Sequence, residues 1–108
     1  MCRRASGAAF LTWVGFSTDL VRFDAIAPST YCSSEAAVRG FCATCGSTLS
    51  MQYRASPHVL DLALGTLDKP ALVAPMQHIW WAEALPWTAL RDGLPHHYLR
   101  GSGSSLAD

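Results

Sequence analysis

Two cysteines separated by two residues, Cys42 and Cys45, are the part of this sequence with the clearest capacity for chemistry. Thiolates at this spacing can bind one zinc ion from a single tight turn. Gly46 follows directly, and a glycine allows the backbone to fold back around the metal. A structural zinc ion takes four ligands in a tetrahedron, so this turn supplies only two of them. The sequence therefore predicts a zinc half-site at Cys42 and Cys45.

A CxxC pair can instead act as a redox-active dithiol. That use places the pair at the start of a helix within a βαβ unit. The residues around Cys42 and Cys45 show no such unit. Zinc binding is therefore the favoured interpretation of the pair.

The remaining cysteines, Cys2 and Cys32, do not belong to a second CxxC pair. Cys32 is interpreted as an ordinary strand or buried cysteine. Cys2 is either an exposed thiol near the terminus or a weak metal ligand, since one thiolate alone is a poor zinc site. A single site that uses all four cysteines is an alternative, but the spacing is irregular for it. Metal binding by His96 and His97 is likewise the less favoured interpretation of that pair.

Length and charge restrict the classes of protein to which this chain can belong. Its 108 residues suffice for one domain, and 50% of them are hydrophobic. Eight basic and eight acidic residues cancel, which argues against an electrostatic nucleic-acid surface. No apolar run approaches the roughly 20 residues of a membrane span, and the first residues do not form a signal peptide. We therefore expect reduced thiols in the cytoplasm, with neither nucleic acid nor membrane as a partner.

The elements that position these cysteines are predicted to be strands. Residues 48–54 alternate apolar and polar side chains, as a half-buried strand does, and residues 59–64 repeat that pattern. No long window has a helical apolar period, so helices should be short and few. The fold class is therefore mainly β and antiparallel. Further strand candidates are residues 8–16, 20–23, 30–31, 37–41 and 76–81.

Four blocks of residues together resemble the glutathione-dependent formaldehyde-activating enzyme family, also called the GFA or CENP-V family. They are Cys2–Phe10, Gly40–Ser47, His78–Trp80 and Leu85–Trp87. Their order and spacing match over roughly Met1 to His96. The resemblance implies a mostly antiparallel β-tent-like zinc domain at residues 1–98, followed by a flexible tail at 99–108.

The resemblance also implies two zinc ions. A structural zinc takes an N-terminal CxC pair and a later CxxC pair, to which Cys42 and Cys45 correspond. A catalytic zinc takes three cysteines from a CxCxxC block, and Cys2 corresponds to the last of these. The CxC pair and the first two cysteines of the block are not in this chain. The domain is therefore expected to be N-terminally incomplete, with Cys2 as a remnant of the catalytic zinc site.

The function implied by the resemblance is that of a zinc-dependent carbon–sulfur lyase that forms or cleaves S-hydroxymethylglutathione or a related thiol adduct. Its partner would be a small-molecule thiol. Arg3 and Arg4 could pair with substrate carboxylates through their bidentate guanidinium groups, and His78 could line the pocket. Activity of this chain is expected to be impaired, because catalytic zinc ligands are missing. The alternative is a non-catalytic, zinc-stabilised β module that binds a partner.

Overall fold

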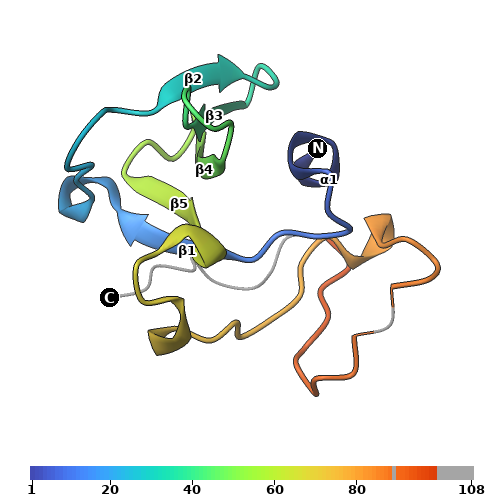
Figure 1. The fold of residues 1–108 in the computed structure, drawn as a ribbon. Helices are drawn as coiled ribbons and strands as arrows, with labels where there is room; N and C mark the ends of the chain where they lie inside the picture. Colours follow the sequence, from blue (N-terminus) through green and yellow to red (C-terminus); the bar gives the residue numbers. More distant parts are fainter. Residues whose placement is uncertain (89, 100–108) are drawn as a thin grey trace.

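The computed structural model describes residues 1–88 and 90–99, and its centre is a five-stranded antiparallel sheet (Figure 1). The strand order across the sheet is β1-β5-β4-β3-β2. This confirms the prediction of a mainly β, antiparallel fold. The strands are β1 (Trp13–Ser17), β2 (Ser29–Cys32), β3 (Ala37–Phe41), β4 (Thr48–Tyr53) and β5 (Val59–Ala63).

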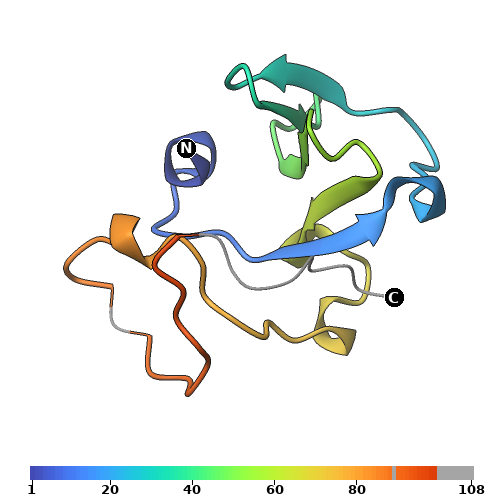
Figure 2. The same ribbon diagram turned by 180° about the vertical axis from the view of Figure 1, so that it is seen from behind.

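Strands β2 to β5 form a meander in which each strand pairs with the next. Strand β1 pairs with β5, so residues 18–28 carry the chain from one edge of the sheet to the other (Figures 1 and 2). The segment 42–47 joins β3 to β4, as the sequence predicted. Neighbouring strands therefore hold the CxxC turn at both of its ends.

The helices are short, as expected. They are α1 (Cys2–Ser6) and four single 3₁₀ turns, η1 (Thr18–Leu20), η2 (Leu64–Thr66), η3 (Pro70–Leu72) and η4 (Trp81–Glu83). Helix α1 ends at Gly7, which adopts the left-handed conformation with φ 73°. In the part of the chain that the structure describes, no helix is long and apolar enough to cross a membrane.

Two strand predictions are wrong, and a third is only partly right. Residues 20–23 form no strand, because the chain turns at η1 there. Residues 76–81 make one isolated parallel bridge, between His78 and His96, and then enter η4. An apolar, aromatic run becomes a strand only where a neighbouring edge offers a ladder of hydrogen bonds, and residues 76–81 lie outside the sheet. Of residues 8–16, those from Trp13 onward are in β1.

Both faces of the sheet carry buried side chains. The buried apolar residues are Val14, Ala37, Met51, Ala63 and Leu64, and the buried polar ones are Arg39 and Ser50. The alternation in residues 48–54 predicted that Ser50 faces water, but it is 7% exposed. Its neighbour across the strands is Gly40. A Cβ at Gly40 would collide with the Ser50 hydroxyl, so the glycine makes room for this buried serine.

Candidate functional site

The CxxC segment closes into a compact turn at the β3–β4 connection. The Cys42 amide donates a hydrogen bond to the Ser47 carbonyl at 2.9 Å, and the Gly46 amide donates to the Cys42 carbonyl at 2.7 Å. Gly46 has φ 79°, a conformation that costs other residues about 1 kcal/mol. The backbone therefore bends in the way that brings two cysteines three positions apart to one side of a turn.

The thiol groups in this turn contact each other and Ser47. The Cys45 Sγ lies 3.0 Å from the Ser47 Oγ. Hydrogen bonds from the Ser47 side chain and backbone, and then from Cys42, lower the pKa of the Cys45 thiol. A lowered pKa favours the thiolate, which is the form that binds a metal.

The turn fits zinc in donor type but not in donor number. A structural zinc needs four ligands. Among residues 1–88 and 90–99, three or more metal-ligating side chains gather at one place, and neither Cys42 nor Cys45 belongs to that group. A zinc ion at the turn would need two ligands from outside the described residues. The four-cysteine alternative is therefore not formed here, since all four cysteines lie in the described part of the chain.

Among the residues that the structure describes, Cys2 forms no metal-ligand cluster with the other thiols, and it lies against a buried arginine. The Arg39 Nη2 donates a hydrogen bond to the Cys2 Sγ at 3.3 Å. Arg39 comes from β3 and Cys2 from α1, and Figure 1 shows α1 beside the β3–β4 part of the sheet. The fold thus places a fixed positive charge next to the Cys2 sulfur.

Arg39 is only 5% exposed, and its Nε and Nη1 atoms are buried without a hydrogen-bond partner. Buried polar groups without partners are uncommon and point to strain or to a ligand that the site is built to receive. The sequence prediction overlooked this residue in favour of Arg3 and Arg4, which are exposed on α1. The sequence did contain a sign of its role, because Arg39 is a charged residue at an inward-facing position of the strand that leads to the CxxC turn.

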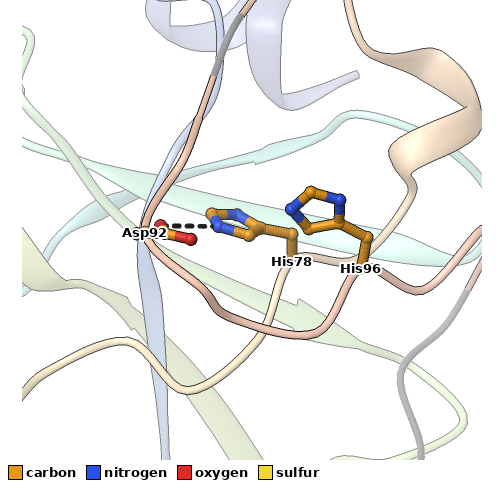
Figure 3. A group of neighbouring side chains, drawn as sticks. All are labelled: His78, Asp92 and His96. Carbon is orange, nitrogen blue, oxygen red and sulfur yellow. Dashed lines mark hydrogen bonds and ion pairs between the residues drawn. The ribbon is translucent and has the colours of Figure 1, made fainter.

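His78 does not lie at either cysteine site. Its Nε2 is 2.8 Å from the Asp92 Oδ2, and its ring lies edge-on to the His96 ring at a centroid distance of 5.0 Å (Figure 3). Two surface hollows, of about 490 and 170 Å³, are lined by neither His78 nor Cys2. The exposed Cys32 accepts a hydrogen bond from the Arg54 Nη2 at 3.0 Å, at the end of β2.

The chain matches the family described as glutathione-dependent formaldehyde-activating enzyme over residues 1–83. The chain belongs to this family. No curated protein matched it. The residues that match the formaldehyde-activating family include Cys2, Arg39, the CxxC pair and His78, whereas Asp92 and His96 lie beyond the match.

Membership of the formaldehyde-activating family gives the cysteine sites their context. A reaction that joins glutathione to formaldehyde needs the sulfur as a thiolate. It also needs positively charged or hydrogen-bond-donating groups that stabilise negative charge. In this chain the turn at Cys42 and Cys45 offers paired thiols, and Arg39 offers a buried cation beside Cys2. These are separate places in the fold.

Proposed function

We propose that this protein forms and cleaves the carbon–sulfur bond of S-hydroxymethylglutathione, or of a closely related thiol adduct, as a zinc-dependent lyase in the cytoplasm. The observation that carries the proposal is the family match over residues 1–83. The thiol pair at Cys42 and Cys45 supports zinc as the cofactor, as two of the ligands of a structural ion.

The reaction needs no redox partner. The glutathione sulfur bonds to the carbonyl carbon of formaldehyde while the carbon–oxygen π pair moves to oxygen. The thiol gives up its proton and the new hydroxyl gains one. The reverse reaction breaks the carbon–sulfur bond and restores both molecules. Because the attacking group is the thiolate, a site that stabilises negative charge on sulfur favours both directions.

Cys2 and Arg39 are the residues that we place at this site. The guanidinium contacts the Cys2 sulfur through Nη2 and keeps Nε and Nη1 free of other hydrogen bonds. Each unused N–H group of a buried guanidinium can donate a charge-assisted hydrogen bond to an anionic group of the substrate. We propose that Arg39 orients an anion beside Cys2. Arg3 and Arg4, exposed on α1, are proposed to contact the carboxylates of glutathione from solvent.

The test is exchange spectroscopy with ¹³C-labelled formaldehyde and glutathione, which measures how fast free and glutathione-bound carbon interchange. It is run on the 108-residue chain with and without added Zn²⁺. We expect exchange above the uncatalysed rate, and slower exchange when Zn²⁺ is withheld.

Variants assign the roles in that assay. Cys2→Ser and Arg39→Lys should each lower the protein-dependent rate by about tenfold or more, whereas Cys32→Ser should leave it unchanged. Circular dichroism of each variant checks that the sheet is intact. If the protein does not accelerate exchange, the lyase proposal fails, and a zinc-stabilised module that binds a partner becomes the better account.

A further inference from the structure

Three side chains near the end of the described chain form a cluster separate from both cysteine sites. His78, Asp92 and His96 each offer a metal-ligating atom, and these atoms all lie within 4.8 Å of one another. Figure 3 shows the His78 ring flanked by the Asp92 carboxylate and the His96 ring. Within the described residues, no other group of three or more such side chains comes together.

Backbone hydrogen bonds fix the spacing between the two histidines. The His78 amide donates to the Pro95 carbonyl at 2.8 Å, and the His97 amide donates to the His78 carbonyl at 2.7 Å. These bonds make the parallel bridge between His78 and His96. The two imidazole groups are therefore neighbours because of main-chain pairing, and their proximity does not depend on side-chain rotation alone.

Two of the three ligand side chains, Asp92 and His96, are also held by a second contact. The Asp92 Oδ1 accepts the Leu94 amide at 3.1 Å, which turns Oδ2 toward His78. This amide bond, followed by the contact with His78, lowers the pKa of the Asp92 carboxyl. The His96 ring stacks on Trp81 at a centroid distance of 3.9 Å and an interplanar angle of 15°. Contacts of this kind orient ligands in known metal sites.

The donor set and its spacing define the class of ion. Two imidazoles and one carboxylate suit zinc and other first-row divalent transition metals, and three protein ligands leave coordination positions open. Ligand atoms around tetrahedral zinc lie about 3.3 Å apart, given zinc–nitrogen bonds of about 2.0 Å. The 2.8 Å separation of His78 Nε2 and Asp92 Oδ2 is close to this, and the His96 ligand atom lies within 4.8 Å of both.

We propose that His78, Asp92 and His96 form a binding site for a divalent first-row transition metal, with open positions for water or an anionic ligand. The site is distinct from the thiolate chemistry proposed above, and it does not depend on it. Two of its three ligands, Asp92 and His96, lie outside residues 1–83, which match the family. The family match therefore does not cover the complete site.

Titration of the full chain with Co²⁺ alone tests the proposal. Cobalt bound by nitrogen and oxygen ligands gives visible d–d absorption, and thiolate ligands add an intense near-ultraviolet charge-transfer band. The spectrum thus separates this site from the cysteines. We expect a d–d signal that saturates at one equivalent and does not depend on the charge-transfer band.

Two substitutions and a control locate that signal. His96→Phe keeps a ring for stacking on Trp81 but removes the nitrogen ligands, and Asp92→Asn keeps hydrogen-bonding capacity but removes the charge. Each should weaken the saturating Co²⁺ binding by about tenfold or more. His58→Phe should leave it unchanged, since His58 is exposed in the turn before β5. Circular dichroism confirms folding, and Asp92→Asn decides the question if His96→Phe fails to fold.

A structural hydrogen bond between His78 and Asp92 without metal binding predicts a different outcome. In that case the wild-type chain shows no saturating signal from nitrogen and oxygen ligands. Equal Co²⁺ affinity in wild type, His96→Phe and Asp92→Asn would also overturn the proposal. A loss of binding in His58→Phe as large as in His96→Phe would show nonspecific histidine binding and would overturn it as well.

Discussion

The CxxC turn and the His78–Asp92–His96 cluster are two collections of metal-ligating side chains that arise in different ways. The turn takes both thiols from six consecutive residues, 42–47, and two paired strands fix its ends. The cluster takes its groups from separate positions in a segment whose described residues form no strand. A site whose ligands are close in sequence depends less on the remaining fold, whereas the cluster exists only while residues 78–96 keep their tertiary arrangement.

The same difference appears in how each group is held. In the turn, local hydrogen bonds and the left-handed Gly46 set the shape. In the cluster, one parallel bridge and the Trp81–His96 stack connect residues that are far apart in the sequence. Loss of packing should therefore affect the two sites unequally.

The largest expected effect is on metal binding by the unfolded chain. In urea sufficient to unfold the sheet, Co²⁺ binding to the cluster should fall by about 100-fold or more, because no preformed site exists in an unfolded chain. The thiolate charge-transfer signal of Cys42 and Cys45 should fall by less than about tenfold, since the loop that joins them is very short. Co²⁺ titration at increasing urea measures both. Parallel loss of the two signals would contradict the comparison.

The next largest effect concerns β3, the strand that precedes the CxxC turn. Gly40→Ala places a Cβ against the Ser50 hydroxyl and should destabilise the protein by about 1–3 kcal/mol. The double variant with Ser50→Ala should recover much of this, because the other neighbours of that Cβ, at 3.4 and 3.5 Å, are at ordinary or nearly ordinary contact distances. Urea unfolding of the two single variants and the double variant gives the coupling. Additive free energies would show that the steric account is wrong.

Alkylation distinguishes the cysteines from one another. Zn²⁺ should slow the reaction of Cys42 and Cys45 with iodoacetamide by about tenfold, because a metal-bound thiolate is a poorer nucleophile. Cys32 contacts Arg54 at the far end of β2 and should react at the same rate with or without zinc. Mass spectrometry of the digested protein measures each site. If Zn²⁺ protected Cys32 from alkylation to the same degree, the result would favour a single zinc site made of all four cysteines.

The smallest expected effect is at the turn itself. Gly46→Ala should cost about 1 kcal/mol, because φ 79° is unfavourable for a residue with a Cβ. Gly65→Ala is the matched control: an added Cβ there meets nothing within 4 Å, and the change should stay within about 0.5 kcal/mol. Thermal unfolding of both variants measures the difference. A Gly46→Ala protein as stable as the control would mean that the turn is not constrained as described.

Prediction from sequence succeeded where the structure follows from a local pattern. It failed where a strand also depends on a neighbouring segment with which to pair. The alternation at residues 48–54 and 59–64 located β4 and β5, since the period of two sets which side chains share a face. Residues 76–81 have strand-like composition, yet they make a single bridge to His96. The composition of a segment shows that it can adopt a strand conformation. To become a strand, the segment also needs an unpaired sheet edge beside it.

The sequence by itself determined the family, the antiparallel sheet and the CxxC turn, because all three follow from motifs and periodicities within short stretches. The tertiary structure alone decided that Arg39, and not Arg3 or Arg4, contacts Cys2, and that His78, Asp92 and His96 come together. Spacing along the chain does not mark such groups. They form because strand pairing, one parallel bridge and ring stacking bring distant residues within a few ångströms of each other.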